Sequence, residues 1–282
     1  MRTIIVLICV GLGLGVGACG ADDTADDSMT RVVASFYPLA YAAEEMGAPG
    51  VEVENLTPAG SEPHDLEVSP RAVADIQSAD LVLLLGHGFQ PQLEDAAGSG
   101  KRVLRLLDTA GLRRLDNDDP HVWLDPHRYS LIVRRIGVAL GAPERAGRLI
   151  GRLRALDRAY AAGLRRCERR ELVTSHEAFA YLAGRYGLVE IAITGISPES
   201  DPAPRDLERV TRRVRETGAT TVFFETLVSP RLAETIARET GARTAKLNPI
   251  EGLTEEEAAR GADYVSLMRA NLAALRRALG CH

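Results

Sequence analysis

The feature that most constrains the fold is an alternation of short apolar segments with amphipathic helical segments, interrupted once by a long stretch without a strand pattern. Short runs rich in Val, Ile and Leu are typical of buried strands, and helices between them favour parallel sheets. Four runs precede the interruption and four follow it, at residues 31–38, 51–58, 79–86, 101–108, 171–176, 189–196, 220–225 and 243–248. The predicted fold class is therefore α/β, with a mainly parallel four-stranded sheet and flanking helices in each half.

The interruption, from about Arg128 to Arg166, predicts a long helix. Pro143 stands at a favourable first-turn position, and apolar residues follow it at helical spacing, namely Leu149, Ile150, Leu153, Leu156 and Tyr160. About 24 residues in a helix extend roughly 36 Å, which is long enough to run along two small lobes. We therefore expect an N-terminal α/β lobe at 31–126, a linker helix region at 127–166 and a C-terminal α/β lobe at 167–282.

The first residues resemble an export signal followed by a lipid attachment site. After Arg2 comes an apolar stretch of about 16 residues, shorter than the roughly 20 that a membrane-spanning helix needs, and VGAC at 16–19 resembles the bacterial lipobox. We expect a signal peptide at 1–18, lipid attachment at Cys19 and a flexible acidic tether at 19–30. Cleavage near Ala18 with free secretion is the alternative. The predicted location is extracytoplasmic, with the protein anchored by lipid to the bacterial cell membrane.

Two cysteines, Cys167 and Cys281, remain beyond the leader and the lipobox. A pair of cysteines in an exported chain favours a disulfide. A catalytic Cys/His arrangement is disfavoured, because Cys167 lies in the arginine-rich segment LRRCERR and Cys281 is next to last. The chain has a net charge of −5, and no basic patch in the sequence argues for a nucleic-acid partner.

Three histidines share one context, at or just beyond the end of a predicted strand or turn. His64 and His121 each follow a proline, and His176 ends the segment ELVTSH. Glu225 and Asn248 end two further strand segments. Because ligands in open parallel sheets gather outside the carboxyl ends of the strands, these side chains would point toward one region if two lobes faced each other. The intervals of about 55 residues match no short zinc-finger pattern, and any one of these histidines alone could be structural or exposed.

The chain resembles the substrate-binding lipoproteins of zinc and manganese ABC importers. The resemblance covers nearly the whole chain after the leader and rests on SFYPLAYAAEEMG, the PHD segment, HVWLDP, VTSHEAFAYLAGRYGL, TTVFFETLVSPRLAETIARETGA and LNPIEGL. It implies two α/β lobes joined by one long helix, a metal ion held in the cleft between them, and an importer permease as partner of a monomer. Carried over to this chain, His64, His121 and His176 would bind the metal.

Two departures from the family pattern concern the metal site. Asn248 stands where an aspartate is usual, and the segment RRLDNDD replaces the long histidine-rich loop of many zinc-specific members. The fourth ligand position is therefore open to Asn248, Glu225, Glu62 or water. Asp65 and Asp125 could orient imidazoles as hydrogen-bond acceptors, or be solvated acids of turns.

Three imidazoles without an aspartate favour Zn²⁺ over Mn²⁺, which prefers carboxylate and water oxygens. We therefore predict a protein that captures zinc and delivers it to an ABC importer without catalysis. The alternatives are a lipid-anchored zinc hydrolase, since three histidines with an open position are also a catalytic pattern, and a manganese-specific binding protein. A metalloprotease HExxH helix would need histidine at position 180, where the chain has Ala180. A surface adhesin is neither supported nor excluded.

Overall fold

The computed structural model describes residues 29–282 except 48–49, 100–101, 113–114, 116–117 and 201. The predicted signal peptide at 1–18, the lipid attachment site at Cys19 and most of the tether at 19–30 lie outside the described residues. Within the described part, no helix is both long enough and apolar enough to cross a membrane.

The first half of the chain forms a four-stranded sheet in the order β2-β1-β3-β4, and all of its pairs are parallel. The elements of this half are β1 (Thr30–Ala34), α1 (Tyr37–Met46), β2 (Val51–Asn55), α2 (Pro70–Ser78), β3 (Leu81–Leu84), α3 (Pro91–Ala97), β4 (Val103–Arg105) and the 3₁₀ turn η1 (Leu106–Asp108).

The second half repeats this arrangement as a parallel sheet in the order β6-β5-β7-β8. Its elements are β5 (Glu171–Thr174), α6 (Ala180–Tyr186), β6 (Val189–Ala192), α7 (Pro204–Thr217), β7 (Thr221–Phe224), α8 (Arg231–Thr240), β8 (Arg243–Lys246), α9 (Glu255–Ala259) and α10 (Tyr264–Leu279). The predicted α/β class with two parallel four-stranded sheets is confirmed. Each strand ends before its apolar run does, because the last residues of the run already belong to the following loop or, at Tyr37 and Leu106, to the start of α1 and η1.

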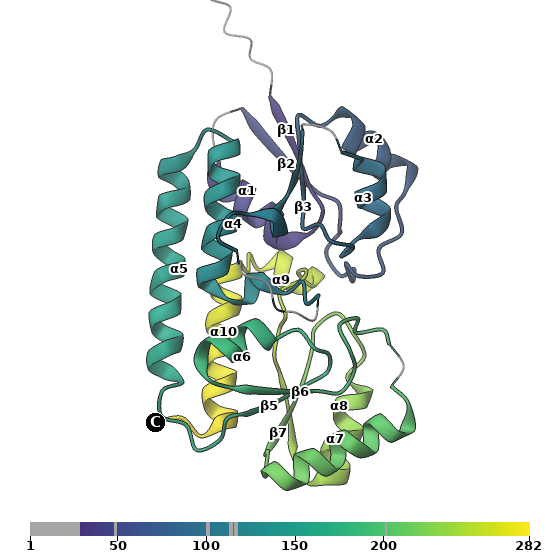
Figure 1. Cartoon of the computed structure of the whole chain (residues 1–282), viewed down its shortest axis with the longest axis vertical. Coiled ribbons are helices and arrows are strands. Elements are labelled where there is room, and N and C mark those ends of the chain that lie inside the picture. Colours follow the sequence, from purple (N-terminus) through teal and green to yellow (C-terminus); the bar gives the residue numbers. More distant parts are fainter. Residues whose placement is uncertain (1–28, 48–49, 100–101, 113–114, 116–117, 201) are drawn as a thin grey trace, which may run out of the picture.

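The segment between the sheets contains the 3₁₀ turn η2 (Val122–Leu124) and the helices α4 (Pro126–Ala139) and α5 (Pro143–Gly163). Helix α5 has 21 residues, so it extends roughly 31 Å along the side of the molecule, past both sheets (Figure 1). It packs against α4, α1 and α10. All five apolar residues expected on its inner face are buried. The end of α5 is joined to the chain terminus by the predicted disulfide between Cys167 and Cys281.

The largest apolar core connects the two halves. The largest cluster of buried side chains includes Leu83 of the first sheet, Leu172 of the second, Leu153 of α5 and Leu275 of α10. Within it the Tyr160 hydroxyl donates to the backbone oxygen of Met268, 2.7 Å away. The helices α4, α5 and α10 therefore hold the two sheets in a fixed relation, with the carboxyl ends of their strands directed toward the region between them (Figure 1).

Candidate metal site

Four side chains from four separate segments meet in the region between the sheets. His64 lies in the loop between β2 and α2, His121 immediately precedes η2, His176 follows β5 by two residues, and Glu251 lies in the loop after β8. Three of these loops begin at the carboxyl end of a parallel strand, which is where such sheets place their ligands. The three predicted histidines thus come together, and the sequence analysis missed Glu251.

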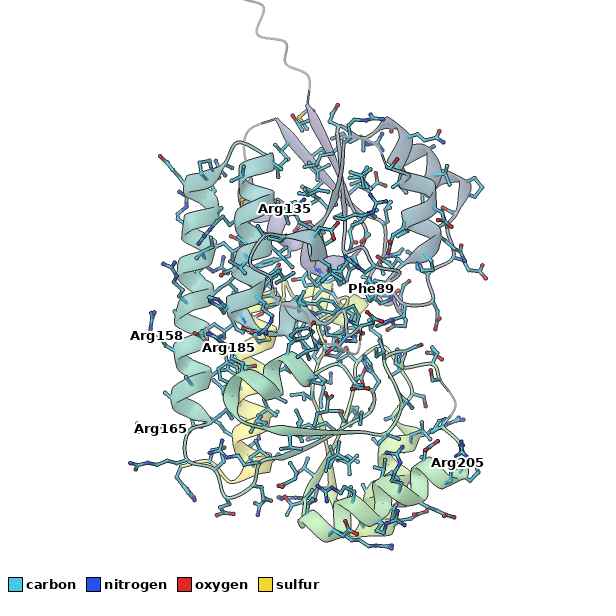
Figure 2. All side chains as sticks on the ribbon, in the orientation of Figure 1. Phe89, Arg135, Arg158, Arg165, Arg185 and Arg205 are labelled. Atoms are coloured by element: carbon cyan, nitrogen blue, oxygen red, sulfur yellow. A yellow bond between two sulfur atoms is a disulfide. The ribbon has the colours of Figure 1, made fainter. Side chains whose placement is uncertain are left out.

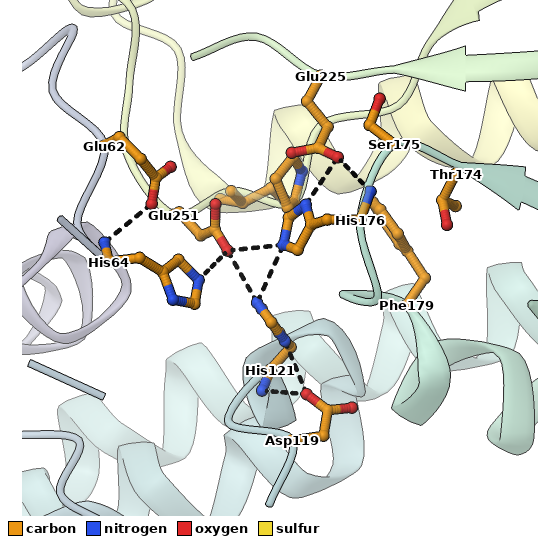
Figure 3. A network of polar contacts seen from close by, with 12 residues as sticks. Glu62, His64, Asp119, His121, Thr174, Ser175, His176, Phe179, Glu225 and Glu251 are labelled. Carbon is orange, nitrogen blue, oxygen red and sulfur yellow. Dashed lines mark hydrogen bonds and ion pairs between the residues drawn. The ribbon is translucent and has the colours of Figure 1, made fainter. Parts of the chain in front are cut away.

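The four side chains converge through one atom each. Glu251 Oε1 lies 3.2 Å from His64 Nε2, 2.9 Å from His121 Nε2 and 3.4 Å from His176 Nε2. The Nε2 atoms of His121 and His176 are 3.3 Å apart, and all four atoms lie within 4.8 Å of one another (Figure 3). His121, His176 and Glu251 are buried, and His64 is partly buried. The arrangement is a compact, nearly solvent-free cluster of three nitrogen donors and one carboxylate.

The opposite nitrogens of two rings are held by acidic side chains. His121 Nδ1 lies 2.7 Å from Asp119 Oδ1, and His176 Nδ1 lies 2.7 Å from Glu225 Oε1. Each carboxylate also accepts the backbone N–H of the same histidine, at 2.8 and 3.1 Å. A carboxylate on Nδ1 directs the lone pair of Nε2 inward and increases its basicity. The predicted strand-end residue Glu225 therefore contacts the outer nitrogen of His176 and is outside the four-atom cluster.

The charges of the cluster are strongly coupled. Burial lowers the pKa of His176, but the carboxylates of Glu225 and Glu251 outweigh burial and hold it well above the usual range. For His121, Asp119 and Glu251 likewise outweigh burial, and its pKa is raised. Burial acts to raise the pKa of Glu251, yet its three imidazole contacts hold it well below the usual range. The carboxylate of Glu251 and the imidazoles of His121 and His176 therefore favour opposite charges on one another.

Glu62 lies beside the cluster in a different charge state. Its Oε1 accepts the backbone N–H of His64 at 2.9 Å, and its other oxygen is buried without a hydrogen-bond partner among the described residues. Burial and, secondly, the charge of Glu251 raise the pKa of Glu62 to about 9. Glu62 is thus an uncharged carboxylic acid at neutral pH, adjacent to the ionised Glu251 (Figure 3).

Asn248 shapes the loop that carries Glu251. Its side-chain oxygen accepts the N–H of Ile250 at 2.7 Å, and its amide nitrogen donates to Glu257 Oε1 at 3.3 Å. Ile250 has φ of 57°, a conformation rarely adopted by a β-branched residue. Both polar atoms of the Asn248 side chain are therefore engaged in the loop. The acidic residue of the cluster, Glu251, lies three positions later in the same LNPIEGL segment, whose acid was the available signal.

Buried aromatic residues fix the loops around the cluster. Trp123 Nε1 donates to the backbone oxygen of Pro249 at 2.8 Å, which ties the loop of His121 to the loop of Glu251. The ring of Phe89 packs edge-on against His64, with centroids 4.7 Å apart. Asp125, considered as an imidazole partner, instead caps α4 through the backbone N–H groups of His127 and Arg128. These contacts hold the ligand loops in place around the cluster.

The chain matches the protein family described as "ZnuA: Zinc-uptake complex component A periplasmic" over residues 32–278. It is 35% identical to the zinc-binding lipoprotein AdcA of Streptococcus pneumoniae serotype 4, over 98% of this chain and 61% of that protein. It is 30% identical to the high-affinity zinc uptake system protein ZnuA of Bacillus subtilis, over 94% of this chain and 93% of that protein. The chain therefore spans about three-fifths of the length of AdcA and nearly all of the Bacillus protein.

Solved structures show the same architecture. The Zn(II)-bound ZnuA-like domain of Streptococcus pneumoniae AdcA superposes with a TM-score of 0.77 at 35% identity, covering 89% of this chain and 99% of that one. The laminin-binding protein Lmb of Streptococcus agalactiae, described as having adhesin and metal-transporting activity, gives a TM-score of 0.80 at 30% identity with the same coverage. These likenesses extend over both sheets and the helices that join them.

Proposed function

Because this chain belongs to the zinc-uptake complex component A family, we propose that it captures Zn²⁺ outside the cytoplasm and delivers it to an ABC-type importer without catalysing a reaction. The relatives that support the metal assignment are named for zinc binding or zinc uptake. The proposal extends to the monomeric state and to a division into lobes at 31–126 and 167–282, joined by the region 127–166.

The observation that carries the proposal is the meeting of three imidazole nitrogens and one carboxylate oxygen within 4.8 Å. A tetrahedral Zn²⁺ with bonds of about 2.0 to 2.1 Å holds its ligand atoms roughly 3.3 Å apart. Four of the six separations among these atoms lie between 2.9 and 3.4 Å, so an ion fits with small side-chain adjustments. We propose that His64, His121, His176 and Glu251 are its ligands.

The donor set also bears on the choice of metal and on catalysis. Imidazole nitrogen suits Zn²⁺, whereas Mn²⁺ favours sites made of carboxylate, carbonyl and water oxygens. Catalytic zinc sites keep one position open for water or substrate, while four protein ligands form a closed site. Here Glu251 supplies the fourth donor and is buried. Both features favour a zinc carrier over a manganese carrier or a zinc hydrolase.

The test is a zinc titration of single alanine variants in competition with a chelator of known affinity. Replacing His64, His121 or His176 should weaken zinc binding by two or more orders of magnitude, because each variant loses one of four strong donors. His87→Ala is the matched control, since His87 is an exposed loop histidine paired with Asp108, with Nε2 and Oδ1 2.8 Å apart. A histidine of the cluster whose loss leaves the affinity at the control value is not a ligand.

We also propose that Cys19 carries a lipid anchor. The support is the VGAC sequence and the lipoprotein name of the AdcA relative. Cys19→Ala should release the protein from the membrane fraction while zinc affinity stays unchanged, because Cys19 is not among the proposed ligands. Complete retention of the variant in membranes would exclude lipid attachment as the anchor.

A further inference from the structure

The charges of this acidic protein are separated in space. Residues 127–170, which include α4 and α5, contain twelve arginines, no lysine and three acidic residues, a net charge of +9. Since the whole chain carries −5, the remainder carries −14 (−5 minus +9). The overall acidity of the sequence therefore conceals a strongly basic segment, which the fold places along one side of the molecule (Figure 1).

Seven arginines of this segment are exposed. The six other than Arg152 make up what we call the basic face: Arg134, Arg148, Arg154, Arg158, Arg165 and Arg166. Three other arginines of the segment, Arg128, Arg152 and Arg169, form ion pairs with carboxylates. Arg152, for example, contacts Glu45 and Asp263 at 2.6 and 2.8 Å. In the described part of the chain, no carboxylate forms an ion pair with any arginine of the basic face. Their charges are thus exposed to solvent and accessible to an external partner.

The surface between these arginines is smooth. Apart from Arg152, the exposed positions of α5 beside and between them are occupied by small residues, namely Gly147, Gly151, Ala155, Ala159, Ala161 and Ala162. Figure 2 shows Arg158 and Arg165 on the outer side of α5, whereas Arg205 lies on the opposite side of the molecule. With few bulky side chains between them, long guanidinium groups can reach a broad, flat, anionic surface together.

The composition of the face favours lipid headgroups over a protein partner. The buried centre of a protein interface is rich in aromatic and other apolar side chains. Among the described residues of α4 and α5, the only exposed large apolar side chain is Val138, at 69%. Arginine side chains with little apolar surface are instead suited to anionic headgroups, where each added basic residue strengthens binding.

The start of the folded chain is close to the first turn of α5. Thr30 N–H donates to the oxygen of Gly50 at 2.6 Å, and the Arg145 guanidinium of the first turn of α5 donates to the oxygen of Gly47. Cys19 precedes Met29 by ten residues, which extend to about 35 Å at most. An anchor at Cys19 would therefore hold α5 within reach of the membrane surface.

We propose that the basic face rests on anionic phospholipid headgroups, so that the tethered protein lies with α5 along the membrane. This inference goes beyond metal capture. It uses the proposed lipid anchor only to bring the protein to the membrane. The anchor confines the protein to the membrane, and the six arginines select which side of it faces the lipid. The interaction weakens as salt increases, because the charges are solvent-exposed.

The test uses the full chain with Cys19→Ala, so that lipid attachment contributes nothing, and measures sedimentation with vesicles of phosphatidylcholine alone or enriched in phosphatidylglycerol. We expect binding only to the enriched vesicles. The triple variant Arg148→Gln, Arg154→Gln and Arg158→Gln should bind about a hundredfold more weakly, at roughly fivefold per arginine. The control, Arg205→Gln, Arg212→Gln and Arg213→Gln on α7, has the same change in charge and should retain binding.

Equal losses in the two triple variants would overturn the proposal, because net charge alone would then explain the binding. Binding that is equal on both vesicle types, or absent from both, would also overturn it. A second measurement needs no substitution in the basic face. Enriched vesicles should protect Arg154 and Arg158, but not Arg205, from an arginine-specific dicarbonyl reagent read out by mass spectrometry. Unchanged reactivity of Arg154 and Arg158 would contradict the proposed orientation.

Discussion

Replacing Glu251 by glutamine tests the proposed zinc site most directly. The substitution preserves the size of the side chain but removes the negative charge that lies 2.9 to 3.4 Å from three imidazole nitrogens. A four-ligand zinc site binds with about 12 kcal/mol at neutral pH, or about 3 kcal/mol per ligand if shared equally. Because the amide oxygen keeps part of this interaction, we expect Glu251→Gln to weaken zinc binding by about a hundredfold.

The assay is a competition titration at pH 7 with a chelator of known zinc affinity, accompanied by thermal unfolding of the metal-free protein. Glu62→Gln provides the matched control, with the same substitution beside the same cluster. Since burial raises the pKa of Glu62 to about 9, its side chain is already uncharged at pH 7, and the amide should change zinc affinity by less than about threefold. A loss in Glu251→Gln no larger than the loss in Glu62→Gln, together with an equally small effect of Glu62→Gln in the Glu251→Gln background, would refute the assignment of Glu251 as a ligand.

The double variant Glu251→Gln, Glu62→Gln tests whether Glu62 can replace Glu251 as a ligand. The charge of Glu251 helps to raise the pKa of Glu62, so removing that charge should let Glu62 ionise more readily. Glu62 could then supply the missing carboxylate and limit the loss in Glu251→Gln. In that case, Glu62→Gln should have a much larger effect in the Glu251→Gln background than in the parent protein. Equal effects in both backgrounds would show that Glu62 does not substitute for Glu251.

Three further predictions concern the disulfide, a buried acid and the loop of Glu251. Replacing Cys167 and Cys281 by serine should lower the free energy of unfolding by up to about 5 kcal/mol, because the disulfide joins residues 114 positions apart. Zinc affinity should not change. A decrease below about 1 kcal/mol, measured by urea denaturation, would contradict this prediction. Burial raises the pKa of Glu190 to about 7, so the folded state binds this proton more tightly than the unfolded state does. The free energy of unfolding should therefore fall by about 3 kcal/mol as pH rises from about 4.5 through 7. Glu190→Gln should lack this decrease, and parallel stability curves for the two proteins would contradict the prediction. Asn248→Ala should weaken zinc binding about tenfold, through loss of the hydrogen bond to the loop, and a loss equal to that of a ligand histidine would indicate that the amide itself binds the metal.

Much of this architecture could be predicted from the sequence, because the relevant patterns are local. Short apolar runs specify the eight strands, and histidines at strand ends converge because parallel strands place their carboxyl ends at one edge. His64, His121 and His176 could therefore be selected before their distances were known. The basic face could not, because it depends on which side of α5 is buried and on which arginines find carboxylates elsewhere in the fold.

The fourth member of the cluster depends on loop geometry, which sequence patterns specify poorly. Asn248, at the end of its strand segment, was one of four candidates for the fourth position, but its side chain accepts the N–H of Ile250, and Glu251 reaches the histidines instead. No residue preference in the sequence predicts the positive φ of Ile250, because β-branched residues rarely adopt this conformation. The imidazole partners Asp119 and Glu225 likewise depend on contacts that only the folded chain brings together.

Because both sheets share the largest apolar core, zinc binding should affect the stability of the whole molecule. Each half also has a smaller buried cluster of its own, but the largest core spans both, so we expect the two halves to unfold together and bound zinc to stabilise the entire chain. At a free zinc concentration a thousand times the dissociation constant, this stabilisation reaches about 4 kcal/mol. Proteases that cleave unfolded chains would then remove empty molecules preferentially, so the abundance of the protein outside the cell would rise with the supply of its metal.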